Sequence, residues 1–270
     1  MIDFSAVVFD IDGTLLNSKG QMLSSTLSVL HKCNQEGIVC YVATARPKRL
    51  VFRPFEIPKH KISYLGHVGV FYNGAVALDE SFSFYRHWPI PSNIVHSITG
   101  EFMNNLPGLN IAIQNEDKFH SFWQSMDDNS VASWGFARDE LLPFSQAREH
   151  SCSKIVIWHK TEDLTELYNK LCFRYNKQVN VFITDSQRWI QITDQKATKE
   201  NALLELLSIR NISPEKVVVF GDDMPDIGMF RTFGFSIAMG NAPAGLKKEA
   251  TFVTRTNDND GIAYAFQHLL

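Results

Sequence analysis

The sequence predicts an α/β protein with a doubly wound, parallel-sheet core that an inserted α+β domain interrupts. Near-continuous apolar strands alternate with helical patterns early in the 270-residue chain, and the same alternation returns after about residue 187. Such strands are typical of a parallel sheet that helices cover on both faces. The segment between them is rich in short aromatic strands. We therefore expect a core domain at 1–82 and 187–270 and an inserted domain at 83–186.

The first core elements follow one another along the chain. Residues 6–11 (AVVFDI) form an apolar run that predicts a strand buried on both faces. Residues 22–36 carry leucines at helical spacing, and Gly37 is placed to end this helix. Residues 38–44 (IVCYVAT) predict a second buried strand, and Pro47 then opens another turn or helix.

The inserted domain differs from the core in its mixture of patterns, which begins near Phe71. Asn73-Gly74 is a strong hairpin signal. Beyond it, LNIAIQN, KFHSFWQ and KIVIWHK predict strands, and residues 92–105 and 161–176 predict helices. This mixture indicates an α+β unit with antiparallel pairing.

The core pattern returns with an amphipathic helix over 199–211. The apolar strand 216–223 (KVVVFGDD) follows and ends in acids. The remaining predicted elements are a helix near 225–233, the strand FSIAMG, a helix after Pro243, the short strand TFVT and a last helix to Leu270.

Composition excludes several classes of function. The formal net charge of -3 gives no sign of a nucleic-acid-binding surface. No run of about 18 apolar residues predicts a membrane span, and the first residues lack the pattern of a signal peptide. None of the four cysteines are spaced as C-x-x-C, so we expect reduced, packed thiols and no zinc site. These features predict a cytoplasmic protein.

Acidic residues directly follow two of the predicted core strands. They are Asp10 and Asp12 after the first strand, then Asp222, Asp223 and, one turn later, Asp226. Burying an ionised carboxylate is costly unless a cation or hydrogen bonds compensate. In an open parallel sheet, ligands bind outside the carboxyl ends of the strands. These acids and Thr44, which ends a third strand, are therefore expected to converge at one edge of the sheet.

Four segments together resemble the motifs of the haloacid dehalogenase-like hydrolases. Residues 10–16 (DIDGTLL) resemble the first motif and residues 43–47 (ATARP) the second. Lys199, in TKENALLELL, resembles the lysine of the third motif, although Lys196 is a nearby alternative, and residues 221–230 (GDDMPDIGMF) resemble the fourth. The tail segments AMGNAPAGLKKEATFVT and NDNDGIA resemble the Cof-type branch. The resemblance implies a Rossmann-like core and a large α/β cap at the position of the insert.

The resemblance also implies a role for each matched residue. Asp10 would be the nucleophile that forms an aspartyl-phosphate, and Asp12 would be the general acid–base. From the residues alone, either acid could instead be a helix N-cap or a turn residue. Thr44, Ala45 and Lys199 would hold phosphate, although Thr44 could equally be a plain N-cap.

Magnesium is the cofactor that the resemblance implies. Asp10 and Asp222 would bind Mg²⁺ together with the backbone carbonyl of Asp12, and Asp226 would hold a metal-bound water or Lys199. Near the junction of core and cap, Arg46 and Asn73 are candidates for contact with substrate. The cap aromatics could line a pocket or form the core of the cap itself. These aromatics are Phe119, Phe122, Trp123, Trp134 and Trp158.

Two positions depart from the pattern of the branch. Ala45 stands where the branch usually has glycine, and Pro225 stands where it usually has an asparagine that helps to hold phosphate. Proline offers no N–H donor, so phosphate affinity or substrate range could differ. An alanine at positive φ would be strained.

The sequence therefore predicts a Mg²⁺-dependent phosphatase. Its substrate would be a small phosphorylated metabolite: a sugar phosphate, a nucleotide or a phosphorylated cofactor. No nucleic acid, membrane or protein partner is expected. Two alternatives remain open, a phosphomutase or phosphotransferase with the same nucleophile and a non-catalytic sensor that binds phosphorylated ligands.

Overall fold

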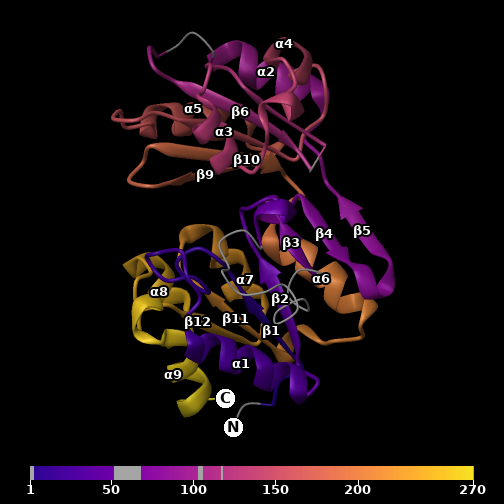
Figure 1. The fold of residues 1–270 in the computed structure, drawn as a ribbon, viewed down its shortest axis with the longest axis vertical. Coiled ribbons are helices and arrows are strands. Elements are labelled where there is room, and N and C mark those ends of the chain that lie inside the picture. The colour runs from indigo at the N-terminus through magenta and orange to yellow at the C-terminus, as the bar shows by residue number, and fades with distance from the viewer. Residues whose placement is uncertain (1–2, 52–67, 103–105, 117, 270) are drawn as a thin grey trace. The chain divides into compact units, whose positions relative to one another are not determined.

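Two sheets organise the computed structural model, which describes residues 3–51, 68–102, 106–116 and 118–269. The chain divides into two compact units. The core unit comprises the described residues of Met1–Arg46, Val51–Arg86 and Lys199–Leu270, and the insert unit comprises those of Pro47–Leu50 and His87–Thr198. Figure 1 shows one sheet in each unit.

The core sheet has eight strands in the order β13-β12-β11-β1-β2-β3-β4-β5. Their bounds are β1 Ala6–Phe9, β2 Val39–Ala43, β3 Val68–Phe71, β4 Val76–Asp79, β5 Phe84–His87, β11 Val217–Gly221, β12 Phe235–Ala238 and β13 Phe252–Val253. The strands from β13 to β3 pair in parallel. The chain leaves the central strand β1 toward β2 on one side and later leaves β11 toward β12 on the other. Because such crossovers are right-handed, their helices cover opposite faces of the sheet. The predicted doubly wound, Rossmann-like core is confirmed.

The helices of the core unit pack on this sheet in two groups. Their bounds are α1 Ser24–Gln35, α6 Lys199–Ile209, α7 Ile227–Thr232, α8 Ala244–Glu249 and α9 Gly261–His268. Helix α1 packs beside α9, and α6 packs beside α7. Phe9 of β1 stacks on Phe220 of β11 with ring centroids 5.1 Å apart, and Phe220 stacks on Phe266 of α9 at 5.9 Å. These rings are part of the packing that fixes the central strands, whose ends carry the acids.

The predicted hairpin at Asn73-Gly74 joins β3 to β4, which pair antiparallel. Tyr72 and Asn73 have φ values of 54° and 56°, and Gly74 has a φ of 103°. Asparagine and glycine tolerate this left-handed region better than other residues do, which explains why the chain turns here.

The insert unit contains a five-stranded sheet in the order β7-β6-β8-β10-β9. Its strands are β6 Asn110–Asn115, β7 Phe119–Phe122, β8 Lys154–Trp158, β9 Val179–Thr184 and β10 Trp189–Asp194. Its helices are α2 Ser92–Phe102, α3 Asp128–Ser133, α4 Phe144–Ala147 and α5 Thr165–Tyr175. The neighbouring strands of this sheet pair antiparallel, as the sequence predicted for the insert.

The aromatic side chains of the insert unit fall into two clusters. Phe119 and Trp123 pack against a buried core that includes residues of α2 and α5. Phe122, Trp134 and Trp158 belong to a second cluster, in which Trp158 stacks on Trp189 with ring centroids 5.3 Å apart. The described contacts of these rings are therefore with other residues of the insert unit, in line with the alternative that they form the core of the insert.

The insert unit does not begin and end where the sequence-based domain limits of 83–186 placed it. Those domain limits stay a prediction. Strand β5 belongs to the core sheet, although the whole strand lies beyond residue 83. Strand β10 pairs with β8 and β9, so it belongs to the insert unit although it lies beyond residue 186. The pairing of each strand decides these limits, and local pattern does not show which sheet a strand joins, so it placed the limits several residues away.

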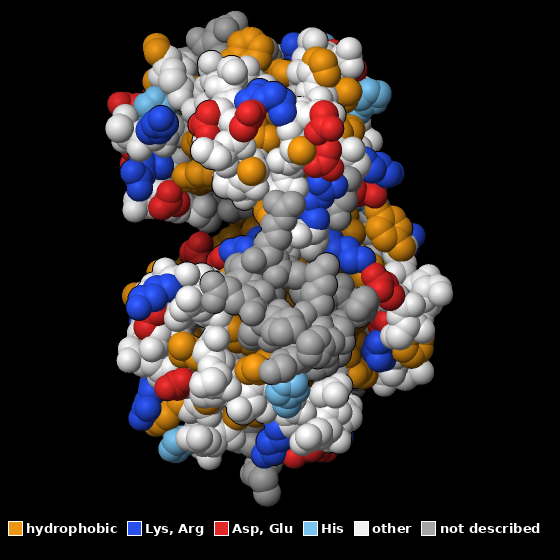
Figure 2. All heavy atoms as spheres, viewed as in Figure 1, with side chains coloured by type: hydrophobic (Ala, Val, Ile, Leu, Met, Phe, Trp, Pro, Cys, Tyr) orange, Lys and Arg blue, Asp and Glu red, His pale blue; other side chains and the backbone are white. Residues whose placement is uncertain are grey.

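Other expectations concern the surface and the cysteines. All four cysteines are free thiols, and Cys172 is only half-buried. No helix in the described part of the chain is long and apolar enough to cross a membrane. In Figure 2, hydrophobic side chains on the visible face are interspersed with charged ones. Among the residues that the structure describes, the large exposed hydrophobic ones are Phe82, Tyr85, Phe173, Met224 and Val253.

Candidate active site

The candidate site lies where the carboxyl ends of β1 and β11 meet in the middle of the core sheet. Phe9 and Phe220 are paired across these parallel strands, and the backbone N–H of Asp10 donates to the Phe220 carbonyl at 3.1 Å. The chain leaves β1 and β11 in opposite directions, so this is the point at which open α/β sheets bind ligands. The predicted convergence of Asp10 and Asp222 at one sheet edge is therefore observed.

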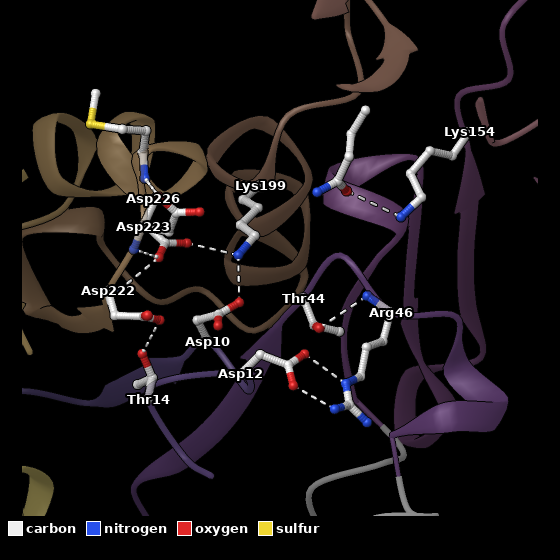
Figure 3. A network of polar contacts seen from close by, with 12 residues as sticks. Asp10, Asp12, Thr14, Thr44, Arg46, Lys154, Lys199, Asp222, Asp223 and Asp226 are labelled. Atoms are coloured by element: carbon white, nitrogen blue, oxygen red, sulfur yellow. Dashed lines mark hydrogen bonds and ion pairs between the residues drawn. The ribbon is translucent and has the colours of Figure 1, made fainter. Parts of the chain in front are cut away.

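Lys199 connects two of the acids from the first residue of α6 (Figure 3). Its Nζ donates to Oδ1 of Asp10 at 2.6 Å and to Oδ1 of Asp226 at 2.7 Å. Burial alone would lower the pKa of Lys199, but the two carboxylates outweigh burial and hold its pKa above the ordinary value. Lys199 therefore remains a buried cation beside Asp10.

Asp226 holds the turn as well as the lysine. Its Oδ2 accepts hydrogen bonds from the backbone N–H of Asp222 at 3.0 Å and of Asp223 at 3.3 Å. The side chain is almost wholly buried, and a Cβ on Gly221 would lie 2.5 Å from Oδ2. Both oxygens of Asp226 thus have protein partners, and one of them is Lys199, one of the two partners predicted for it; a contact with a metal-bound water stays a prediction.

The Asp222 carboxylate is held by donors on both oxygens. Thr14 Oγ1 donates to Oδ1 at 2.9 Å, and Asn241 Nδ2 donates to Oδ2 at 3.2 Å. Gly13 lies against this carboxylate with a φ of 78°, and a Cβ there would come within 2.1 Å of Oδ2. Glycine is therefore required at position 13 both for its conformation and for space. Burial raises the pKa of Asp222 to about 7, and repulsion from Asp226 adds to the rise.

A divalent cation fits the group formed by Asp10, Asp222 and Asp226. One carboxylate oxygen of each lies within 4.8 Å of the others. Burial raises the pKa of Asp10 well above its ordinary value, and Lys199 lowers it only in part. One lysine thus faces more negative charge than it can neutralise. Carboxylate oxygens are the ligands that Mg²⁺ prefers, so the donor set suits this ion. The carboxylate of Asp12 is not part of this group.

Asp12 forms a bidentate ion pair with Arg46, a relationship that sequence reasoning missed. Arg46 Nε donates to Oδ2 of Asp12 at 2.6 Å, and Nη2 donates to Oδ1. The Asp12 side chain is 58% exposed, whereas that of Arg46 is 25% exposed. Figure 3 shows Asp10 directed toward Lys199 and Asp12 toward Arg46. Arg46 thus contacts the predicted acid–base, and its contact with substrate stays a prediction. No local pattern signals this pair, because its members follow different strands.

Thr44 and Asn73 lie together beside β2 and β3. The Thr44 hydroxyl accepts a hydrogen bond from the Arg46 backbone N–H at 3.1 Å, as a capping residue does. The Thr44 carbonyl accepts from the Asn73 backbone N–H at 3.0 Å. Both side chains are buried. Thr44 therefore has the turn-forming contact that the sequence left open as an alternative. Its contact with phosphate, and that of Asn73 with substrate, stay predictions.

The structure accommodates both departures from the family pattern. Ala45 is not among the described residues with positive φ, so alanine brings no left-handed strain to this position. Pro225 lies in the first turn of a short 3₁₀ helix, Met224–Asp226, which Asp223 caps by accepting from the Met224 N–H at 2.8 Å. Proline suits a first helical turn, where its missing N–H has no intrahelical partner to lose.

Sequence reasoning gave no role to two asparagines that reach this site. Asn241 Nδ2 donates to the Gly13 carbonyl at 2.9 Å, and Asn257 Nδ2 donates to the Leu16 carbonyl at 2.8 Å. Both lie in tail segments, AMGNA and NDND, that resembled the family. That resemblance was the one signal that could have drawn attention to them.

Known proteins share this sequence pattern along nearly the whole chain. Residues 7–266 match the family model described as haloacid dehalogenase-like hydrolase. Phosphatase YwpJ of Bacillus subtilis is 27% identical over 290 residues, which cover 98% of this chain and 99% of that protein. The 5-amino-6-(5-phospho-D-ribitylamino)uracil phosphatase YitU of the same organism is 22% identical over 272 residues, with 95% and 94% of the two chains covered.

Solved structures share the fold. The structure of the sugar phosphatase BT4131, described as subclass IIB of this superfamily, superposes with a TM-score of 0.79 at 22% identity. The match covers 97% of this chain and 98% of that one. The fold of this chain is therefore already known from a solved structure.

Proposed function

The chain belongs to the haloacid dehalogenase-like hydrolase family, and we propose that it is a Mg²⁺-dependent phosphatase of small phosphorylated metabolites. The observation that carries the proposal is the buried network in which Lys199 links Asp10 to Asp226 beside Asp222. A lysine and a cation site around one carboxylate suit the binding of a phosphate dianion next to a nucleophile. The named activities of YwpJ and YitU support the same reaction class.

In the proposed first step, a carboxylate oxygen of Asp10 attacks phosphorus. A bond forms between this oxygen and phosphorus, and the bond from phosphorus to the ester oxygen breaks. Asp12 gives its proton to the leaving oxygen, so the alcohol departs neutral. The product on the protein is an aspartyl-phosphate, which divides a difficult hydrolysis into two easier displacements.

In the proposed second step, Asp12 takes a proton from water and the resulting hydroxide attacks phosphorus. The bond between phosphorus and Asp10 breaks, which returns the carboxylate and releases inorganic phosphate. Both oxygens of Asp12 accept from Arg46 in the structure, so one of the two contacts must open before that oxygen can exchange a proton, while the other contact keeps Asp12 oriented. Both side chains are partly exposed to solvent, so packing around them leaves room for this movement.

Lys199 and the cation would share the electrostatic part of the reaction. Asp10 and Asp222 are the residues we propose to hold Mg²⁺, with the Asp12 carbonyl as a further ligand. When bound, Mg²⁺ would screen the repulsion between the phosphate and the anionic nucleophile. Lys199 would keep Asp10 oriented and balance part of the negative charge throughout.

A screen of phosphate release tests the proposal. The full-length protein would be assayed over sugar phosphates, nucleotides and phosphorylated cofactor precursors, with Mg²⁺ and with a chelator. We expect Mg²⁺-dependent release that Asp10→Asn lowers by about 10³-fold or more. Asp3→Asn is the control, because Asp3 is an exposed acid that pairs with Lys216.

Three outcomes would contradict the proposal. Equal phosphate release by the wild type and Asp10→Asn would exclude Asp10 as the nucleophile. Conversion of a hexose 1-phosphate to its isomer without phosphate release would identify a phosphomutase. Binding of a phosphorylated ligand without turnover of any compound would instead identify a sensor.

A further inference from the structure

Asn241 connects the loop after β1 to the end of β11. Its side-chain Nδ2 donates one hydrogen bond to the Gly13 carbonyl at 2.9 Å and another to Oδ2 of Asp222 at 3.2 Å. Gly13 directly follows the two acids of the first motif, and Asp222 follows a different strand. The amide group of Asn241 therefore bridges the two segments that carry the proposed metal ligands, beside the direct bond from Thr14 to Asp222.

The orientation of this amide is fixed by its third partner. Oδ1 of Asn241 accepts a hydrogen bond from the Asn257 backbone N–H at 3.1 Å. Acceptors thus lie on the nitrogen side of the amide and a donor lies on its oxygen side. Both protons of Nδ2 have a partner, and a flip of the amide would place its oxygen against the Asp222 carboxylate. The side chain is on the surface, yet only one orientation satisfies these bonds.

The segment that orients Asn241 is itself tied to the first loop. Asn257 Nδ2 donates to the Leu16 carbonyl at 2.8 Å, and Oδ1 of Asp258 accepts from the Ser18 backbone N–H at 2.8 Å. The loop after β1 is therefore held along its length by residues 241 and 257–258. Among these contacts, the bond from Asn241 to Asp222 reaches a proposed metal ligand, and it would be lost if Asn241 were displaced.

We infer that Asn241 is a positioning residue that sets the affinity for Mg²⁺ by orienting the Asp222 carboxylate. With Thr14 on Oδ1 and Asn241 on Oδ2, this carboxylate is held in one plane against Gly13. Residues that orient a metal ligand in this way change metal affinity by about 10- to 100-fold when they are replaced. The inference rests on the proposed function, because it requires Asp222 to bind the cation.

The deciding variant is Asn241→Leu, which keeps the approximate shape of asparagine and removes its donors and acceptor. Asn259→Leu is the matched control, because Asn259 lies in the same tail and its Nδ2 donates to Thr256 Oγ1 at 2.7 Å. Asn241→Ser, which retains one hydroxyl donor, is a milder variant. Asp222→Asn reports whether the site binds Mg²⁺ at all.

Mg²⁺ binding to the full-length protein is measured by calorimetric titration without substrate, and melting temperatures are measured in chelator. We expect Asn241→Leu to raise the Kd for Mg²⁺ by about 10- to 100-fold, with a smaller rise for Asn241→Ser and none for Asn259→Leu. With p-nitrophenyl phosphate, the Mg²⁺ concentration for half-maximal rate should rise in parallel. The KM for that ester should not change at saturating Mg²⁺.

An unchanged Kd in Asn241→Leu, or an equal rise in Asn259→Leu, overturns the inference. If Asn241→Leu melts well below the wild type in chelator, the Kd of Asn241→Ser decides in its place, and an unchanged value again overturns the inference. The inference on Asn241 can fail while the wild type binds Mg²⁺ and Asp222→Asn does not. In that case the proposed function still stands. If the wild type binds no Mg²⁺, the proposed function fails and the inference fails with it.

Discussion

Lys199 Nζ lies 2.6 Å from Oδ1 of Asp10, although the two residues are 189 positions apart in the chain. Their side chains are 4% and 10% exposed, so the ion pair is almost shielded from water. In this setting, removal of one partner leaves the other charge without compensation. The pair links the start of α6 to the end of β1, so the stability of the core unit and the proposed chemistry depend on the same contact.

Replacement of Lys199 by methionine should destabilise the protein strongly. Asp10 and Asp226 would remain buried without their shared cation, and the loss of one partner from a buried pair costs about 3–5 kcal/mol. Urea unfolding in chelator measures this free energy. Lys216→Met is the control, because its pair with Asp3 is exposed and should contribute at most about 1 kcal/mol. If both variants lose the same free energy of unfolding, the buried network contributes no more to stability than the exposed ion pair does.

Replacement of Arg46 by lysine should lower kcat while leaving KM nearly unchanged. Lysine keeps the charge but cannot reproduce the two-pronged contact with Asp12, so the acid–base would lose its fixed orientation. A fall of about 10-fold or more is expected, larger for an alkyl phosphate than for p-nitrophenyl phosphate, whose leaving group needs less protonation. A rise in KM with constant kcat would instead assign Arg46 to substrate binding, as the sequence predicted.

Addition of Mg²⁺ should raise the melting temperature of the wild type. A cation that binds the folded state alone at 100 times its Kd adds about 2.7 kcal/mol to the free energy of unfolding. Asp222→Asn should abolish this shift, whereas Asp223→Asn should retain it, because Asp223 is exposed and caps a turn. Scanning calorimetry with Mg²⁺ and then with excess chelator checks the result. A shift that survives Asp222→Asn would place the ion elsewhere.

The insert unit should lose stability as the pH falls below about 6.5. Burial lowers the pKa of His120 from 6.5 to about 3, and the charges of Lys154 and Arg49 add to this effect. Between these pH values His120 binds a proton in the unfolded chain but not in the folded unit, so the free energy of unfolding declines as pH falls. The decline due to His120 should reach roughly 3 kcal/mol at pH 4.

Comparison of His120 variants isolates this contribution. The ring of His120 lies 5.2 Å from that of Trp134, so tryptophan fluorescence in urea reports on unfolding of this cluster. In His120→Phe, the free energy of unfolding should fall less steeply between pH 6.5 and pH 4. Phe122→Leu disturbs the same cluster without removing the histidine and should keep the slope of the wild type. Identical slopes in all three proteins would refute the assignment.

Much of the core could be predicted from local pattern. Strands buried on both faces are apolar throughout, and helices that cover a sheet carry apolar residues at helical spacing, so β1, β2, β11, α1 and α6 are visible in the chain itself. Acids that directly follow two such strands must lie at the carboxyl ends of the sheet. The meeting of Asp10 and Asp222 follows from that geometry once their strands are neighbours.

Contacts between distant segments could not be read in this way. The pairing of Asp12 with Arg46, the two bonds of Lys199 and the bridge from Asn241 to Gly13 and Asp222 depend on side-chain directions across different strands and loops. Strand β10 likewise joins the insert sheet because β8 and β9 offer it partners. Periodicity encodes which face of an element is buried, whereas the packed fold determines which neighbour that face meets. The residue types at this site could therefore be predicted from the sequence, whereas the partners of these residues are determined by the tertiary fold.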